Sequence, residues 1–213
     1  MCGRYRRTSD KKRIAEEFHV ESGLDEAAFS PSDNITPGTF QPVVYMNEHG
    51  EVAIGSMLWG FKFERLTFNA RADKLSTNPF WKSTLKTQRC IVPADSIFEW
   101  SHIYKDTKKN PKYEITIPGQ EPFGMAAIWH LWKQPDTGDG AATLAVITTD
   151  PNEEWAKIHN RQTAILKPRE YMEWLTPNER PPLHLLRVFP EEEMQIRLAG
   201  GLDPGFQLSL TGL

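Results

Sequence analysis

The sequence contains only two cysteines, Cys2 and Cys90, among its 213 residues. Two thiols can form at most one disulfide, so the sequence excludes a disulfide framework and lacks the ligand spacing of a zinc site. We therefore expect a cytoplasmic protein in a reducing compartment, where a thiol with a chemical role stays free. Cys90 lies in a short apolar run and is expected to be an inert buried thiol.

Long hydrophobic stretches are also missing. No run approaches the roughly 20 apolar residues that cross a bilayer, and the N-terminus up to His19 is basic and polar rather than an apolar signal core. We expect no membrane association. The hydrophobic content of 39% and the charged content of 25% are ordinary for a globular domain. A net charge of −3 does not by itself indicate nucleic acid, so any DNA affinity must come from a local, salt-sensitive basic groove.

Short apolar runs separated by turn residues dominate the remaining pattern. They predict strands over 41–46, 51–59, 89–93, 96–100, 112–117, 123–129, 142–149 and 163–166. Polar caps or first-turn prolines predict short helices beginning at Thr8 or Ser9, Asn78-Pro79, Asp150, Pro168 and Pro190. Residues 20–40 and 101–111 are expected to be loops. This order predicts an α+β fold with a mainly antiparallel sheet, in a single domain over residues 1–213 with a weakly ordered tail from about 200 to 213.

The first residues, Met1-Cys2-Gly3-Arg4, carry the most distinctive chemistry. We expect the initiator Met1 to be removed, which leaves Cys2 with a free α-amine beside its thiol. The ordinary pKa is roughly 8 for the amine and about 8.5 for the thiol, so both nucleophiles are accessible near neutral pH. The pair can condense with an aldehyde to a Schiff base and then a thiazolidine, or it can hydrolyse an amide with the amine as base. The alternative is a frayed terminus in which Cys2 has no role.

A carboxylate and an imidazole are candidates for proton transfer. Period-two alternation places Glu99 on the same strand face as Ile97. If Ile97 points inward, desolvation raises the pKa of Glu99 toward neutrality. The alternative is an edge-strand glutamate that faces water. His159 follows a predicted helix, whose dipole would favour the charged imidazole, although a structural capping histidine is the commoner case. Asn69 could bind a substrate oxygen or be an ordinary turn residue.

Several motifs occur in the order found in one known family. They are Met1-Cys2-Gly3-Arg4, Asp33-Asn34-Ile35-Thr36-Pro37-Gly38, Leu58-Trp59-Gly60-Phe61, Asn69-Ala70-Arg71-Ala72-Asp73, Ser96-Ile97-Phe98-Glu99-Trp100, Met125-Ala126-Ala127-Ile128-Trp129 and Ile158-His159-Asn160-Arg161. From Cys2 to about Leu175 the chain resembles the SOS-response-associated peptidase (SRAP) family. The resemblance implies a barrel-like core with short flanking helices. The Pro-rich segment 177–190 departs from the usual closing sequence of the family.

The resemblance implies a role for each matching residue. The family captures abasic sites in single-stranded DNA through its N-terminal cysteine, so Cys2 would form a Schiff base and then a thiazolidine. Asn69 would orient the cysteine and the sugar, Glu99 would move protons, and His159 would assist opening of the sugar ring. The implied DNA-binding residues are Arg4, Arg71 and Arg161 on phosphates, Trp59 and Trp100 as stacking or wedging aromatics, and Asn34 and Pro37 in a loop beside the site.

The resemblance also implies the partners of the protein. We expect single-stranded DNA with abasic sites, and as an extension junctions of single- and double-stranded DNA, to be bound by a monomer at the nucleoid. No metal or organic cofactor is required. Two alternatives remain: a thiol-dependent autopeptidase or amidohydrolase that uses Cys2, and a non-covalent binder of single-stranded DNA or modified bases.

Overall fold

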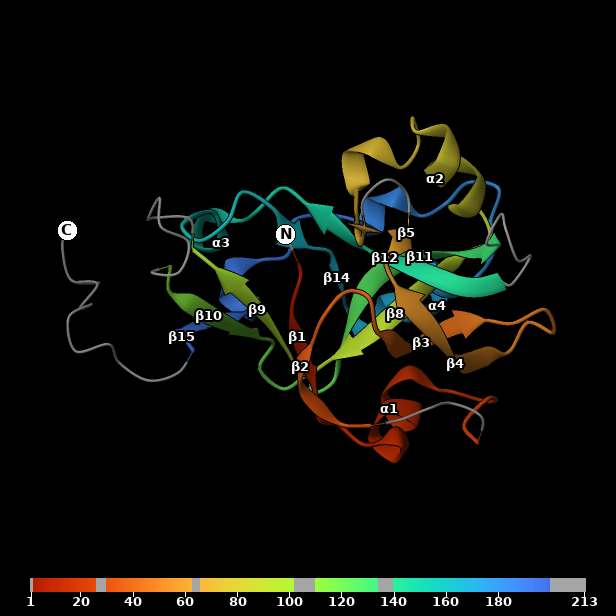
Figure 1. Ribbon diagram of the computed structural model, residues 1–213, viewed down its shortest axis with the longest axis horizontal. Helices are drawn as coiled ribbons and strands as arrows, with labels where there is room; N and C mark the ends of the chain where they lie inside the picture. The colour runs from red at the N-terminus through yellow and green to blue at the C-terminus, as the bar shows by residue number, and fades with distance from the viewer. Residues whose placement is uncertain (1, 26–29, 63–65, 102–109, 134–139, 200–213) are drawn as a thin grey trace.

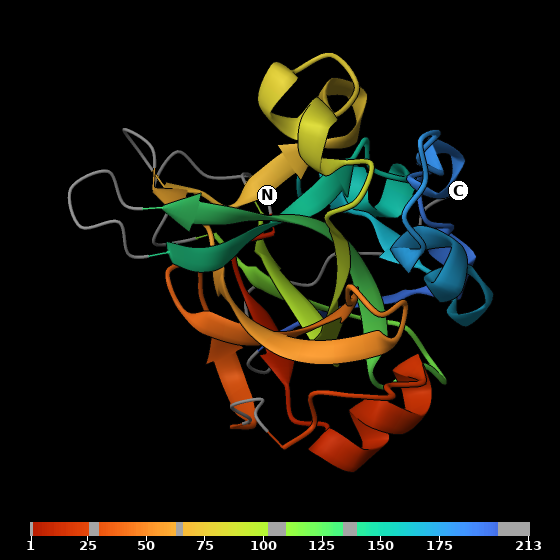
Figure 2. The same cartoon turned by 90° about the vertical axis from the view of Figure 1, so that its right-hand side faces the viewer.

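Hydrogen-bonded strands form a closed ring at the centre of the molecule. The computed structural model describes residues 2–25, 30–62, 66–101, 110–133 and 140–199. The ring runs through β12 (Gly140–Thr149), β4 (Val52–Trp59), β3 (Phe40–Met46), β8 (Arg89–Ala94) and β11 (Phe123–Lys133), which pairs with β12 again. The β12–β4 pair is parallel and the other four pairs are antiparallel. Figure 2 shows these curved strands with α2 above and α1 below them, and confirms the expected barrel-like core.

Short strands extend both edges of β12 beyond the ring. On one edge, β7 (Asn69–Arg71) continues where β4 ends, and on the other β13 (Gln162–Thr163) continues where β11 ends. β14 (Ile165–Leu166) pairs with β11, so the predicted strand 163–166 is split in two. β5 (Phe61–Lys62) and β6 (Leu66–Thr67) form a separate small hairpin. The end of β12 therefore brings together segments that are about 90 residues apart in the chain.

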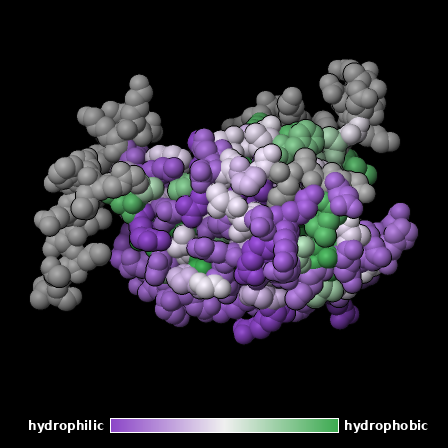
Figure 3. Space-filling view, turned by 90° about the horizontal axis from the view of Figure 1, so that it is seen from below, coloured by the Kyte–Doolittle hydropathy of each residue, from purple (hydrophilic) through white to green (hydrophobic). Residues whose placement is uncertain are grey.

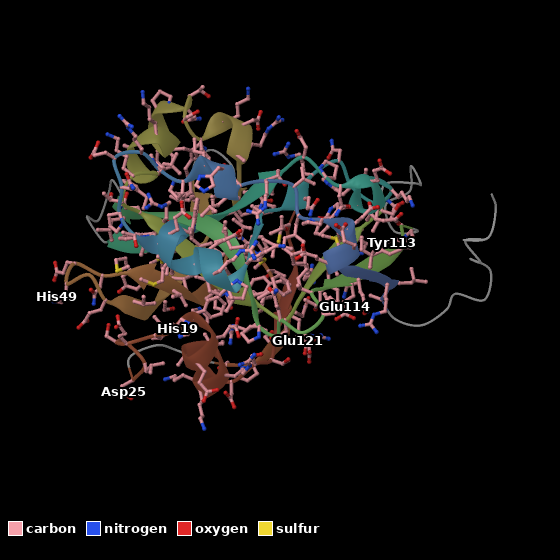
Figure 4. The ribbon with its side chains drawn as sticks, turned by 180° about the vertical axis from the view of Figure 1, so that it is seen from behind. His19, Asp25, His49, Tyr113, Glu114 and Glu121 are labelled. Carbon is pink, nitrogen blue, oxygen red and sulfur yellow. The ribbon has the colours of Figure 1, made fainter. Side chains whose placement is uncertain are left out.

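A second, antiparallel sheet contains the N-terminal strand. Its order is β15 (Gln195–Leu198), β10 (Lys112–Thr116), β9 (Ser96–Trp100), β1 (Tyr5–Arg7) and β2 (Ser32–Ile35). β2 lies in the segment 20–40 that we expected to be a loop, because pairing with β1 overrides its polar sequence. In Figure 4, Tyr113 and Glu114 of this sheet lie at the opposite end of the molecule from His49 in the β3–β4 turn.

Both faces of the ring strands are buried, in two separate cores. Along β3, Val43 belongs to one core and Val44 to the other, as the period-two alternation of a strand requires. The face of Val44 packs against α1, α2 and α4. The face of Val43 packs against the second sheet, through residues such as Ile97 and Ile115, and this core also contains Cys2.

Short helices cover the outside of the ring. They are α1 (Lys11–Phe18), α2 (Pro79–Thr84), α3 (Glu153–Ala156) and α4 (Tyr171–Leu175), with 3-10 turns η1 (Ala72–Lys74), η3 (Pro168–Glu170), η4 (Leu183–Leu185) and η5 (Glu191–Glu193). None of the helices within the described ranges is long and apolar enough to cross a membrane. The surface seen from below is mostly hydrophilic with small separate apolar areas (Figure 3).

Two of the predicted helix caps are wrong. Asp10, not Thr8 or Ser9, caps α1 by accepting a hydrogen bond from the backbone N–H of Arg13, because Thr8 and Ser9 are engaged by another carboxylate. Asn152, not Asp150, caps α3. The predicted Asn78 cap of α2 is confirmed.

The predicted loop 101–111 is described only in part. Residues 102–109 lie outside the described ranges, as does the tail from 200, while Ser101 and Asn110 are buried rather than exposed.

Candidate active site

Cys2 lies at the junction of the two sheets, immediately before β1. Its side chain is only 1% exposed. The pairing of β1 with β9 matches Tyr5 with Ile97, and the backbone N–H of Phe98 donates to the carbonyl of Arg4 at 2.8 Å. This register carries the N-terminal segment along β9 toward Glu99. In Figure 1 the chain enters β1 near the centre of the picture, below the N label.

The surroundings of Cys2 keep its thiol protonated. Burial is the main reason that its pKa is raised to about 12. The negative charge of Glu99 also raises this pKa, whereas the Thr163 hydroxyl, the charged amino terminus and the backbone N–H of Arg4 lower it. The protonated thiol therefore predominates at neutral pH, in contrast to the accessible thiolate expected from the sequence. A nearby base must therefore take the thiol proton during any reaction.

Among the described residues, Glu99 is the carboxyl group whose charge acts on the thiol. β9 is an inner strand between β10 and β1, and Ile97 on the same face is fully buried. The reading of Glu99 as an edge-strand residue in water is therefore wrong, and the inward reading is confirmed. Burial raises the pKa of Glu99 to about 7, against the opposing effects of the charged amino terminus, a hydrogen bond with it, and the backbone N–H of Trp100. Both protonation states are populated near neutral pH, as proton transfer in both directions requires.

Asn69 and Thr163 lie on the same face of the sheet, on opposite edges of β12. Asn69 pairs with Val146, and Thr163 pairs with Thr148, two residues further along. Residues that are opposite each other in a ladder, or two apart along a strand, share a face. Val146 belongs to the core that contains Cys2, so this is the face of the thiol.

Asn69 has a polar atom available on this face. Its Nδ2 donates to the carbonyl of Val146 at 3.4 Å, which fixes the orientation of the amide. Its Oδ1 is buried and accepts no hydrogen bond from the part of the chain that the structure describes. An unsatisfied buried oxygen costs free energy, so this one favours a donor such as an amine or a sugar hydroxyl.

Thr163 was missed by the sequence analysis. Its side chain is 1% exposed, and its hydroxyl is close enough to Cys2 to lower the pKa of the thiol. The one signal in the sequence was its place two residues after the His159-Asn160-Arg161 motif. A threonine in a predicted strand is otherwise read as a β-branched residue that packs well in a sheet.

The orientation of His159 is set by its neighbours on the same loop. Its backbone N–H donates to the carbonyl of Trp155 at 2.9 Å, and its Nδ1 accepts from the backbone N–H of Arg161 at 3.0 Å. A ring whose Nδ1 accepts is neutral, with its proton on Nε2. This arrangement does not support the expected dipole-stabilised imidazolium, because α3 has only four residues and ends at Ala156.

Two of the predicted phosphate-binding arginines are paired with acids. Nε and Nη2 of Arg71 donate to the two carboxylate oxygens of Asp73, both at 2.9 Å. Nη1 of Arg161 donates to Asp150 at 2.5 Å and its Nη2 to the carbonyl of Thr148 at 2.7 Å. A cavity of about 370 Å³ is lined by Arg161 and by both acids, Asp73 and Asp150, together with Leu183, Leu186, Arg187 and Val188. Its size is in the range of small-ligand sites.

Arg4, Asn34 and Trp100 form a third group. The guanidinium of Arg4 lies 5.3 Å from the centre of the Trp100 ring, and its Nη1 donates to Oδ1 of Asn34. Nζ of Lys112 lies 5.6 Å from the same ring. Asn34 is exposed and Trp100 partly so. Cations beside a partly exposed aromatic ring are an arrangement that binds unpaired bases and phosphates.

Trp59 is not available to stack on DNA. It is 1% exposed, its Nε1 donates to the carbonyl of Phe68 at 3.0 Å, and its ring packs edge-on against Tyr5 at 5.3 Å. The structure gives no support to the predicted stacking role, because an inward strand position buries this tryptophan. Pro37 is half-buried in a turn held by the Gly38 N–H, which donates to the carbonyl of Trp59 at 2.8 Å.

Sequence and structure comparisons place the chain among known proteins. A family model described as SOS response associated peptidase (SRAP) matches residues 1–199. The abasic site processing protein YoqW of Bacillus subtilis (strain 168) is 32% identical over 206 residues, which cover 92% of this chain and 90% of the relative. The abasic site processing protein YobE of the same organism is 30% identical over 193 residues, covering 87% of this chain and 86% of the relative.

More distant proteins are similar as well. The abasic site processing protein HMCES of Gallus gallus is 28% identical over 205 residues, which cover 80% of this chain and 61% of the relative. A crystal structure of a protein from Bacteroides thetaiotaomicron superposes with a TM-score of 0.79 at 24% identity, covering 92% of this chain and 91% of the other. With a family match over nearly the whole sequence, the chain belongs to the SOS response associated peptidase (SRAP) family.

Proposed function

We propose that the chain processes abasic sites in single-stranded DNA by forming a covalent crosslink through Cys2 once Met1 has been removed. The observation that carries the proposal is the coupling of the buried Cys2 thiol to Glu99, whose pKa is about 7 and which also interacts with the amino terminus, the amine that removal of Met1 would transfer to Cys2. An amine, a thiol and a carboxylate that titrates near neutrality are the groups that condensation with an aldehyde needs. Relatives over most of the chain length are named abasic site processing proteins, which supports the same substrate.

The reaction follows from these groups. The deoxyribose ring of an abasic site opens when its hydroxyl loses a proton and its ring oxygen gains one, and the Nε2–H of His159 is the donor we assign to that oxygen. The amine of Cys2 adds to the aldehyde carbon, and loss of water gives a Schiff base. Glu99 takes the thiol proton while sulfur adds to the same carbon, and the nitrogen of the former double bond receives that proton. The product is a five-membered thiazolidine, and the reverse sequence of steps releases the DNA.

The remaining residues hold the strand. Arg4 and Trp100 would bind one side of the abasic nucleotide, while Arg71 and Arg161 would bind the phosphates on the other. Oδ1 of Asn69 would accept a hydrogen bond from the Cys2 amine or from a sugar hydroxyl. We infer a single domain that acts as a monomer at the nucleoid of the cytoplasm and needs no cofactor. Binding at junctions of single- and double-stranded DNA extends this proposal.

A crosslinking experiment tests the proposal. The wild type, Cys2→Ala and Cys2→Ser are incubated with single-stranded DNA that has one abasic site and are separated on a denaturing gel. We expect a shifted band for the wild type only, and a wild type that yields no band would end the proposal. A band that persists in Cys2→Ala would assign the bond to another nucleophile. The family description also names a peptidase, and Cys2-dependent hydrolysis of a peptide library without crosslinking would favour that alternative.

A further inference from the structure

A buried hydroxyl next to the thiol has no role in the steps described above. Thr163 is 1% exposed, and its Oγ1 makes no hydrogen bond within the described residues, the Cys2 sulfur included. A hydroxyl removed from water without a partner costs free energy, so its burial calls for a compensating interaction. This hydroxyl favours the charged form of Cys2, so the sulfur becomes its partner only when the thiol loses its proton.

The fold fixes the direction of this hydroxyl. Thr163 lies in β13, and its pairing with Thr148 turns both side chains toward the face of Val146 and Cys2. The neighbouring residue Ala164 is locked on both sides, because its N–H donates to Ile147 at 2.9 Å and its carbonyl accepts from Ala126 at 2.9 Å. A β-branched side chain on a strand held this firmly has little rotational freedom. The hydroxyl is therefore positioned before any substrate arrives.

We propose that Thr163 is a positioning residue whose hydroxyl donates a hydrogen bond to the sulfur of Cys2 as the thiol loses its proton. The hydroxyl keeps its own proton throughout. The thiol proton passes to Glu99, the sulfur–carbon bond forms, and the nitrogen takes the proton, so the balance of the step is unchanged. The expected effect on crosslinking to abasic DNA rests on the proposed function, whereas the expected effect on the reactivity of the Cys2 thiol does not.

The other groups around the sulfur cannot take this role. The titratable groups coupled to Cys2 are Glu99 on β9, Tyr5 on β1 and the amino terminus. A carboxylate disfavours the thiolate, and burial raises the pKa of the Tyr5 phenol. The Arg4 backbone N–H and the amino terminus also favour the thiolate, but they belong to the same terminal segment as Cys2 and move with it. Thr163 is thus the side-chain donor that the sheet presents to the sulfur.

The test measures the alkylation rate of the Cys2 thiol in the absence of DNA. Thr163→Val removes the hydroxyl and keeps the shape, Thr163→Ser restores the hydroxyl, and all variants carry Cys90→Ala so that one thiol remains. A hydrogen bond to a charged group corresponds to a roughly 10-fold or larger effect on an equilibrium. We expect alkylation by iodoacetamide to be about tenfold slower in Thr163→Val across pH 7–9, and to recover in Thr163→Ser. Equal rates in Thr163→Val and its parent would overturn the proposal.

Two further arms keep the test decisive. Thr163→Ala serves if Thr163→Val does not fold, since a smaller side chain cannot clash, and thermal unfolding confirms that each variant is native. Crosslinking to abasic DNA should fall by the same factor as alkylation. If crosslinking falls while alkylation does not, the hydroxyl acts on the sugar and the proposal is wrong. If even the parent does not crosslink, the proposed function fails and the alkylation result still decides the role of Thr163.

Discussion

Replacing Glu99 with glutamine should stabilise the fold at high pH and abolish efficient crosslinking at the same time. The side chain is 5% exposed, and burial raises its pKa from the ordinary 4.5 to about 7. A carboxyl group with a raised pKa binds its proton more tightly in the folded state than in the unfolded state. Its contribution to stability is therefore complete below pH 4.5 and is lost as the pH rises through 7. Glutamine keeps the shape and carries no charge at any pH.

The magnitude follows from the two pKa values. Each pKa unit corresponds to about 1.4 kcal/mol, so ionisation of Glu99 costs the folded state about 3 kcal/mol once it is complete. We expect the free energy of unfolding of Glu99→Gln, relative to the wild type, to be about 2–3 kcal/mol more favourable at pH 8 than at pH 5. The proposed reaction instead needs a side chain that ionises, because only a carboxylate can accept the thiol proton.

Urea denaturation at pH 5 and pH 8 measures this difference directly. Glu192→Gln is the matched control, since Glu192 is solvent-exposed on η5 and its neutralisation should change stability little at either pH. Crosslinking of abasic DNA by both variants completes the comparison. The reasoning is refuted if the stability of Glu99→Gln relative to the wild type is the same at both pH values, or if Glu99→Gln crosslinks at the wild-type rate.

Three further substitutions test other parts of the structure. Asp150→Asn removes the acid paired with Arg161, so single-stranded DNA with a stable abasic analogue should bind about two- to fivefold more tightly at low salt. Fluorescence anisotropy measures this affinity, and unchanged or weaker binding would contradict phosphate binding by Arg161. Trp59→Phe loses the hydrogen bond to Phe68 and should lower the free energy of unfolding, measured by urea denaturation, by about 1–3 kcal/mol. Its DNA affinity should be unchanged, and a selective loss of affinity would support the predicted stacking role. Arg89→Met should lower the free energy of unfolding by at least about 3 kcal/mol in the same assay, because this buried guanidinium donates to backbone carbonyls at the ends of both α2 and α4. A loss below about 1 kcal/mol would contradict this capping of the two helix ends.

The fold could be predicted from the sequence as far as local patterns reach. The strands and the Asn78 cap follow from short-range alternation and capping chemistry. The closed ring does not, because the parallel contact of β12 with β4 joins residues about 85 positions apart, as in the pairing of Thr143 with Leu58. The Asp10 cap was missed for a related reason: Asp95, far away in the sequence, engages Thr8.

The candidate site shows the same contrast between what local sequence predicts and what long-range pairing decides. Alternation along one strand placed Glu99 on the same face as Ile97, but only the observed burial of Ile97 shows that this face points inward. The burial of Trp59 depends on a sheet packed against it, which one strand does not reveal. Thr163 became visible only through the register of β13 against β12, because a threonine in a strand carries no signal of its own. Local sequence therefore identified the groups that we propose to react, and long-range pairing identified what surrounds them.

Intact-mass measurement tests the central claim most directly. Purified protein is weighed before and after reaction with a single-stranded oligonucleotide that contains one abasic site. We predict a free protein without Met1 and an adduct equal to protein plus DNA minus one water, unchanged in mass by borohydride because a thiazolidine has no reducible double bond. A protein that keeps its initiator methionine, or an adduct that gains hydrogen on borohydride treatment, would contradict the account.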